Sequence, residues 1–156
     1  MKKKSGEGCI EICILTVIFC IILSVMISFV TTVEVIKQTK RNTREVLDSF
    51  VMKNSVEIYN SVKNGNDYIV SIDNKDYVDR FCSFNSLKEE NGMLCFYDEN
   101  GEKQYCVTEP WLEFYEDNQM KIKVSFVMKI PVFFAGINIS EVNVPIKVIS
   151  TYENKF

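Results

Sequence analysis

The sequence predicts an α+β protein in which a long N-terminal helix packs on a small antiparallel β-sheet. Residues 12–33 contain no charged side chain and no Pro or Gly, a pattern that predicts a transmembrane helix. Two later segments, 120–134 and 142–148, alternate apolar and polar residues with a period of two, which predicts strands with one apolar face. A helix followed by antiparallel strands is an α+β order.

The predicted transmembrane helix covers residues 7–33. Its uncharged part lies between Glu11 and Glu34 and has 22 residues. At about 1.5 Å per residue it extends for about 33 Å, enough to cross a hydrocarbon core of roughly 30 Å. We therefore expect the lipid bilayer to be its partner.

A basic start, Met1 to Lys4, precedes the apolar segment as it does in a secretory signal peptide. The apolar segment is longer than the about 7–15 residues of a signal peptide, however, and no A-x-A site follows it. The chain has a single Ala, Ala135. We expect the segment to stay attached to the protein.

Small, weakly polar residues recur along the apolar helix at steps of three and four, which places them on one face. They are Cys9, Cys13, Thr16, Cys20, Ser24, Ser28 and Thr31. Such a face lets membrane helices approach closely, so we predict helix packing through Cys13 to Thr31 of this set. The alternative is that Ser and Thr bond back to their own helix and are tolerated at any position.

Glu11 lies at the N-terminal end of the apolar helix. A carboxylate at this depth is costly unless it has a partner, which makes Glu11 a functional candidate. The alternative is that Glu11 reaches the head groups and interacts with the free N–H groups of the first helical turn.

The segment Lys3-Lys4-Ser5-Gly6-Glu7-Gly8-Cys9-Ile10-Glu11 has a Gly after a basic leader and a Glu five residues later. It resembles the processing site of type IV pilin-like precursors, most closely that of the TadE-like pilus-assembly pseudopilins and related membrane proteins of Gram-positive bacteria. The resemblance covers mainly residues 2–40. It implies a leader of residues 1–6, removed by a prepilin peptidase between Gly6 and Glu7. The chain departs from the major-pilin pattern in having Glu7, and not Met or an aromatic residue, after the cut.

The resemblance implies a structural role as a minor pseudopilin of an envelope pilus, secretion or conjugation apparatus. Its partners would be other pilin-like or envelope-machine subunits, and Glu11 would pair with the free amine of a neighbouring subunit. The N-terminus would be cytoplasmic and the C-terminal domain outside, an orientation that the nearly balanced positive charges around the helix leave open. The alternative function is a single-span anchored extracytoplasmic domain that binds a partner or ligand without assembly.

Apolar residues recur at helical spacing beyond the apolar helix, and no helix breaker occurs before Asn64-Gly65. We predict an amphipathic helix over residues 34–65, with the wholly polar residues 39–44 as a candidate break. Residues 66–156 would form the β-rich domain. Within it, residues 68–72 are predicted as a short strand, and residues 73–91 give mixed signals and no prediction.

Residues 93–108 are predicted as a hairpin, because Asn100-Gly101 favours a type I′ turn. This turn would place Glu99 opposite Glu102, Asp98 opposite Lys103 and Cys95 opposite Cys106. Directly opposed residues have Cα atoms about 4.5–5.5 Å apart, within reach of a disulfide. We predict a Cys95–Cys106 bond, with Cys82 as a competing partner or a free thiol.

The strands over residues 120–134 and 142–148 are predicted to form an antiparallel ribbon with a loop over 135–138. Its apolar face needs a cover, which we expect the amphipathic helix to provide. Pro131 and Pro145 lie inside these segments, so each marks an edge or a bulge.

The chain has no His, which removes the commonest general base and metal ligand. It also lacks a Gly-rich phosphate loop and a C-x-x-C motif. We expect no enzymatic activity, no cofactor and no metal, and the net charge of −3, spread along the chain, predicts no nucleic-acid partner. Trp111, Phe114 and Tyr115 are predicted to belong to the core, with an exposed contact patch as the alternative.

Overall fold

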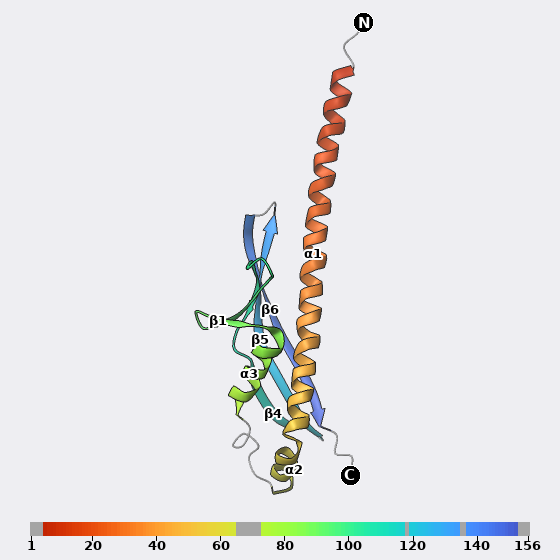
Figure 1. The fold of residues 1–156 in the computed structure, drawn as a ribbon. Coiled ribbons are helices and arrows are strands. Elements are labelled where there is room, and N and C mark those ends of the chain that lie inside the picture. The colour runs from red at the N-terminus through yellow and green to blue at the C-terminus, as the bar shows by residue number, and fades with distance from the viewer. Residues whose placement is uncertain (1–4, 65–72, 118, 135–136, 153–156) are drawn as a thin grey trace.

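The computed structural model describes residues 5–64, 73–117, 119–134 and 137–152 (Figure 1). A long N-terminal helix packs on a six-stranded antiparallel sheet, so the predicted α+β class is confirmed. The helices are α1 (Ser5–Lys53), α2 (Ser55–Asn64) and α3 (Asn74–Asn85). The strands are β1 (Lys88–Glu90), β2 (Met93–Tyr97), β3 (Lys103–Val107), β4 (Trp111–Asp117), β5 (Gln119–Phe134) and β6 (Ile137–Tyr152). The strand predicted over residues 68–72 lies outside the described residues.

Helix α1 is unbroken for 49 residues. Residues 39–44, the candidate break, are helical, and three of their polar side chains, Thr39, Asn42 and Thr43, turn inward where the protein offers partners. The Thr43 hydroxyl donates to the Thr39 carbonyl at 2.6 Å, and both residues are buried. Asn42 donates to the Asn85 side chain of α3 at 2.9 Å. The polar stretch therefore anchors α1 to α3 and does not interrupt it.

The interruption lies at Asn54, so the prediction of a continuous helix to residue 65 is wrong. The Phe50 carbonyl accepts both from the Asn54 backbone N–H, at 3.1 Å, and from the Asn54 side chain, at 3.0 Å. Asn is a poor residue for a helix interior because its side chain competes for backbone groups in this way. Helix α2 begins one residue later, and the Ile58 N–H donates to the Asn54 carbonyl at 2.9 Å.

Strand β5 is the centre of the sheet. Strand β6 pairs with it along nearly its whole length, from Met120 opposite Tyr152 to Phe134 opposite Ile137. Strands β4 and β3 share the other edge of β5, where β4 pairs with residues 119–125 and β3 with residues 128–129. Strands β2 and β1 extend the sheet beyond β3. Since Ile137 is already paired, the connection is shorter than the predicted loop over 135–138.

Both prolines occupy places where a strand has a free edge, as predicted. Pro145 lies in β6, whose one partner among the strands that the structure describes is β5. Pro131 lies in the part of β5 beyond β3, where β6 is its only partner among the described strands. Proline is tolerated there because no ladder hydrogen bond is lost on the open side.

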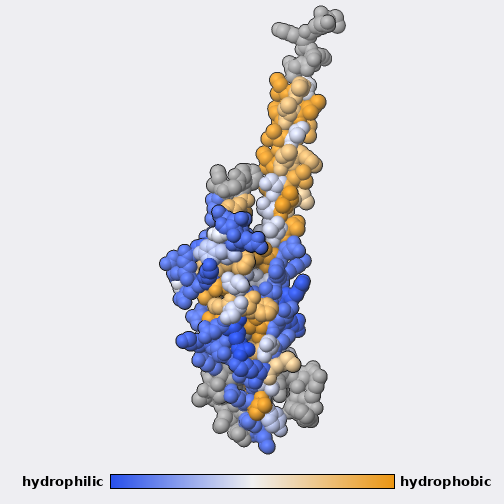
Figure 2. Space-filling model, in the orientation of Figure 1, coloured by the Kyte–Doolittle hydropathy of each residue, from blue (hydrophilic) through white to orange (hydrophobic). Residues whose placement is uncertain are grey.

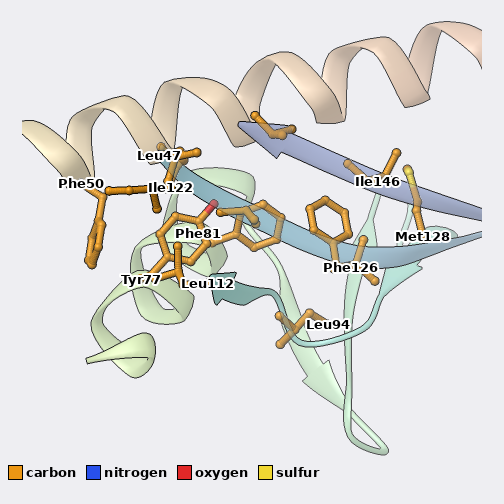
Figure 3. Close-up of a cluster of buried hydrophobic side chains, with 14 of the residues drawn as sticks. Leu47, Phe50, Tyr77, Phe81, Leu94, Leu112, Ile122, Phe126, Met128 and Ile146 are labelled. Carbon is orange, nitrogen blue, oxygen red and sulfur yellow. The ribbon is translucent and has the colours of Figure 1, made fainter. Parts of the chain in front are cut away.

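The core lies between one face of the sheet and the helices α1 and α3 (Figure 3). The predicted apolar face of β5 is buried in full, from Ile122 to Ile130. Helix α1 contributes Leu47 and Phe50, so the expected helical cover is confirmed. Burial of each such side chain stabilises the fold by about 1.5–3 kcal/mol.

Helix α3, for which no prediction was made, completes the core with two aromatic residues. The Tyr77 ring meets Phe50 of α1 edge-on at 5.4 Å between centroids. It stacks on Phe81 at 6.2 Å, and Phe81 contacts Phe126 of β5 at 5.4 Å. This row of rings joins both helices to the central strand.

Tyr77 carries the one buried side-chain polar atom that has no hydrogen-bond partner among the described residues, its hydroxyl oxygen. Figure 3 shows this oxygen among apolar side chains. Burial raises the pKa of Tyr77 well above its usual range, so the hydroxyl is neutral at physiological pH. Tyr105 is also buried, but its hydroxyl bonds to Thr39 of α1.

We predict that Tyr77→Phe raises the free energy of unfolding by about 1 kcal/mol, because it removes an unpaired buried hydroxyl. Tyr105→Phe is the matched control and lowers the free energy of unfolding by about 1 kcal/mol, because it removes a hydroxyl that has a hydrogen-bond partner. Urea unfolding of the detergent-solubilised chain, followed by circular dichroism, measures both. A loss of stability in Tyr77→Phe equal to that in Tyr105→Phe would contradict the unpaired state of Tyr77.

Candidate functional site

The candidate functional site is the N-terminal half of α1, which extends beyond the sheet (Figures 1 and 2). Every Ile, Leu, Val, Phe and Met side chain from Ile10 to Val30 is exposed, by 42% at Leu23 to 69% at Leu15. Leaving so many apolar side chains in water costs tens of kcal/mol, at about 1.5–3 kcal/mol each. This exceeds the roughly 5–15 kcal/mol stability of a folded domain, so this half of α1 requires a non-aqueous cover.

The change from exposed to packed residues on α1 occurs near Thr32. Val35 and Ile36 are the first α1 residues that pack against the core, and Val46 and Leu47 are buried in it. The uncharged segment ends at Val33, immediately before this packed part. The helix is therefore long and apolar enough to cross a membrane, and the described part of the chain buries none of its most apolar stretch.

The small polar residues of α1 satisfy their hydroxyls within the helix itself. The Thr16 hydroxyl donates to the Ile12 carbonyl at 2.8 Å, and the Thr31 hydroxyl donates to the Ile27 carbonyl at 3.0 Å. The Ser28 hydroxyl donates to the Ser24 carbonyl, also at 3.0 Å. These bonds are those of the alternative interpretation, and they pair the hydroxyls of Thr16, Ser28 and Thr31 within the helix.

The predicted packing face divides into two parts. Ser28 and Thr31 line a groove of about 190 Å³ between α1 and the β5–β6 hairpin, together with Ile27 and Phe133. The earlier residues of the face do not line this groove and are exposed: Cys9, Cys13, Thr16, Cys20 and Ser24. The part of the face open to a second helix is therefore residues 9–24.

Glu11 is exposed and forms no ion pair or hydrogen bond with any described residue. It follows Cys9 by two residues, so it lies about 200° around the helix from Cys9. Gly6 and Glu7 lie in the first turn of α1, with helical backbone. The structure thus brings no group of the sheet near the predicted processing and assembly residues.

The Cys95–Cys106 disulfide is present, and the two residues are directly opposed with Cα atoms 4.0 Å apart. Its prediction is confirmed, although the turn differs from the expected type I′. Of Asn100 and Gly101 only Gly101 has positive φ, +81°, whereas type I′ requires it at both. The Gly101 N–H donates to the Asp98 carbonyl, and the Asp98 N–H donates to the Glu102 carbonyl, each at 3.0 Å.

The hairpin consequently has a three-residue loop, and Asp98 faces Glu102 and not Lys103. The pairing then shifts by one residue, from Tyr97 opposite Lys103 to Phe96 opposite Tyr105. This shift cancels the extra loop residue, so the predicted register returns at the two cysteines. The Asp98 carboxylate stabilises the loop by accepting from the Glu102 N–H at 2.8 Å.

Cys82 is a free thiol on α3 and is not a partner of either bonded cysteine. Burial raises the pKa of the Cys82 thiol, and the carboxylates of Asp79, Glu89 and Glu109 raise it further. The thiolate is the reactive form of cysteine, so this thiol is a poor nucleophile.

A hollow of about 290 Å³ lies beside the disulfide. Its lining has charges of both signs and apolar side chains, contributed by Glu90, Met93, Lys103, Lys129, Pro131, Phe133 and Glu141 among others. Lys103 pairs with Glu90 at 2.7 Å, and hydrogen bonds from Lys103 and Tyr97 lower the pKa of Glu90. No three His, Cys, Asp or Glu residues within the described ranges are placed to hold a metal ion. The charged and apolar side chains that line the hollow are of the kinds that contact a ligand in a binding site.

The prediction that Trp111 belongs to the core is wrong. This residue lies on β4 with 64% of its surface exposed and does not belong to the core. Its neighbour Leu112 is buried, and Phe114 is partly buried against the core. Alternation along β4 turns Trp111 and Tyr115 to the other side of the sheet. The apolar residues Leu112 and Phe114 alternate with Glu113, and this period of two is the sequence signal that could have identified the strand.

Comparison with family models, with curated proteins and with solved structures finds no match to this chain.

We predict that the Cys95→Ser, Cys106→Ser double variant loses about 3 kcal/mol of unfolding free energy. The bond closes a short loop, with a sequence separation of 11 residues, and cross-links of this length stabilise by about that amount. Thermal or urea unfolding of the detergent-solubilised protein measures the loss. Cys82→Ser is the matched control and leaves the stability nearly unchanged; a double variant as stable as this control would show that the bond contributes nothing.

Proposed function

We propose that this chain is a structural single-span membrane protein, a minor pseudopilin-like subunit of an envelope pilus, secretion or conjugation apparatus. It assembles through its transmembrane helix and presents the β-rich domain outside the cytoplasm. The observation that carries the proposal is the uncovered apolar half of α1, joined without a break to a half that packs on the sheet.

The dimensions of α1 support a transmembrane position. The uncharged residues 12–33 extend for about 33 Å, against a hydrocarbon core of roughly 30 Å. All backbone groups of this segment are bonded within the helix, as a lipid environment requires. Charged residues return at Glu34, where the packed half begins, so the domain starts at the membrane surface.

The surface of the transmembrane helix supports lateral assembly. Cys13, Thr16 and Cys20 form a small-residue face on which a second helix can approach closely, and the Thr16 hydroxyl already has a partner in its own helix. Glu11 lies on a different face with no partner within the described residues. Because a carboxylate near hydrocarbon requires a counter-charge, the free amine of a neighbouring subunit is its proposed partner.

The Cys95–Cys106 disulfide supports an extracytoplasmic position for the sheet, because such bonds persist in oxidising compartments. The N-terminus then lies in the cytoplasm. Following the resemblance of its first forty residues to TadE-like pseudopilins, a prepilin peptidase would remove the basic leader after Gly6.

A second candidate function is an anchored domain that binds a partner or ligand without assembly. The hollow beside the disulfide favours a binding function, because its lining combines charges of both signs, from Glu90, Lys103, Lys129 and Glu141, with apolar side chains. The two functions differ in two measurable properties. Only the pseudopilin-like function requires cleavage after Gly6, and only that function requires Glu11 for self-assembly.

We predict that the chain is recovered in the membrane fraction, resists extraction by alkaline carbonate, and has a mature N-terminus at Glu7. Mass spectrometry of the N-terminal peptide, from cells that carry a prepilin peptidase, measures the cleavage. Gly6→Ala is the control and blocks it. A membrane-bound chain that begins at Met1 or Lys2 favours the anchored binding domain, and a chain that is soluble without detergent contradicts both functions.

We predict that Glu11→Gln lowers self-assembly in membranes by more than half. The readout is the yield of dimers formed by oxidative cross-linking at Cys13 and Cys20. Glu34→Gln, at the opposite end of the uncharged segment, is the matched control and leaves the yield unchanged. Equal yields in Glu11→Gln and the unmodified chain would remove Glu11 from the assembly mechanism.

A further inference from the structure

The β5–β6 hairpin extends beyond the rest of the sheet, alongside the apolar half of α1 (Figure 1). Strand β3 pairs with β5 only as far as Lys129, and beyond this residue β5 and β6 pair only with each other within the described strands. The paired residues continue to Phe134 opposite Ile137. This part of the hairpin therefore projects from the sheet toward the N-terminal end of the molecule.

The projecting part of the hairpin carries no charge. Between Lys129 and Glu141 there is no Asp, Glu, Lys or Arg. Two of its apolar side chains are exposed, by 44% at Phe133 and 63% at Ile139, and Val132 is half-buried. Exposed aromatic and aliphatic residues near the end of a strand pair are costly in water and typical of an interaction surface.

The hairpin lies at the same level of α1 as the end of the uncharged segment. Phe133 and Val132 line the groove with Ile27, Ser28 and Thr31 of α1. From Ile27 to Val33, the last uncharged residue, α1 rises by about 9 Å at 1.5 Å per residue. A membrane that covers residues 12–33 therefore reaches the hairpin as well.

We propose that the projecting end of the β5–β6 hairpin, through Val132, Phe133 and Ile139, inserts into the outer leaflet of the bilayer that α1 spans. The inference rests on the transmembrane position of α1 in the proposed function. The partner is lipid, because the hairpin lies beside the uncovered helix, is uncharged like it, and has charged residues only where the hydrocarbon would end. The two flanking residues, Lys129 and Glu141, then lie among the head groups.

The backbone limits how deep the hairpin inserts. Strands β5 and β6 bond to each other, but the outer edge of each is open in the projecting part. Open sheet edges are not tolerated in the hydrocarbon interior, since their N–H and C=O groups have no partner there. The insertion is therefore confined to the boundary of head groups and acyl chains, a depth of about 5–10 Å.

Tryptophan fluorescence in lipid vesicles tests the insertion, because the chain has a single Trp, Trp111. It lies on β4, at the end of the sheet away from the hairpin tip (Figure 1). In a Trp111→Phe background, Phe133→Trp and Ile139→Trp place the fluorophore on the hairpin, and Ile21→Trp places it inside the apolar helix. The full chains are reconstituted in vesicles of phosphatidylcholine and phosphatidylglycerol, with and without bromine near the head-group end of the acyl chains.

The proposal predicts that brominated lipid removes more than half of the emission at positions 133 and 139 and little of the emission from Trp111 in the unmodified chain. Quenching of a Trp at position 21, with bromine placed deeper in the chains, establishes that α1 spans the vesicle membrane. If position 21 is quenched and positions 133 and 139 are not, the hairpin proposal is overturned and the transmembrane helix stands. If position 21 is also unquenched, both are overturned. Blue-shifted but unquenched emission at both hairpin positions would also overturn the proposal, since it indicates a protein cover in place of lipid.

Discussion

The structure depends on one constraint, that a single unbroken helix occupies two different surroundings. In its C-terminal half, Leu47 and Phe50 are buried against the sheet and α3. In its N-terminal half, from Ile10 to Val30, every apolar side chain is exposed. Both halves are α-helical, so the side chains determine which half packs on protein and which stays uncovered. The change occurs near Thr32, and under the proposed transmembrane position it sets where the sheet lies relative to the membrane.

The packed half is held by polar contacts as well as by apolar ones. Thr39 is buried with its carbonyl accepting from Thr43, and its side chain bonds to Tyr105 of β3. Asn42 bonds to Asn85 at the end of α3. Burying such groups is unfavourable unless each has a partner, so the two contacts that reach other elements, Thr39 with Tyr105 and Asn42 with Asn85, favour one rotation of α1 about its axis. The apolar stripe alone would tolerate small rotations.

The elements with strong local signals were predictable from the sequence, and those defined by tertiary contacts were not. An uncharged segment of 22 residues and the period-two pattern of β5 each have one structural solution. Helix α3 has a cap at Asp73 and buries Tyr77 and Phe81 at helical spacing, but charged residues between them obscure the pattern. The interruption at Asn54 accompanies a second hydrogen bond to the Phe50 carbonyl, from the Asn54 side chain, which the apolar periodicity of the sequence does not record.

The candidate site divides in the same way. The disulfide was predictable although the turn was not. The loop has one residue more than predicted, but the pairing shifts by one residue between Tyr97 and Phe96, so the predicted register is restored at Cys95 and Cys106. The separation of Ser28 and Thr31 from the rest of the small-residue face was not, because it follows from where the β5–β6 hairpin lies beside α1. That position results from the folding of residues about a hundred positions away.

The absence of any interruption in α1 between Val33 and Lys53 has a mechanical consequence. Many membrane-anchored domains are joined to their anchor by a flexible linker and adopt many orientations relative to the bilayer. Here the apolar segment and the sheet share one stiff helix, so under the proposed transmembrane position a tilt or a rotation of α1 turns the sheet through the same angle. A neighbouring subunit that binds the apolar half of α1 would then also set the orientation of the sheet.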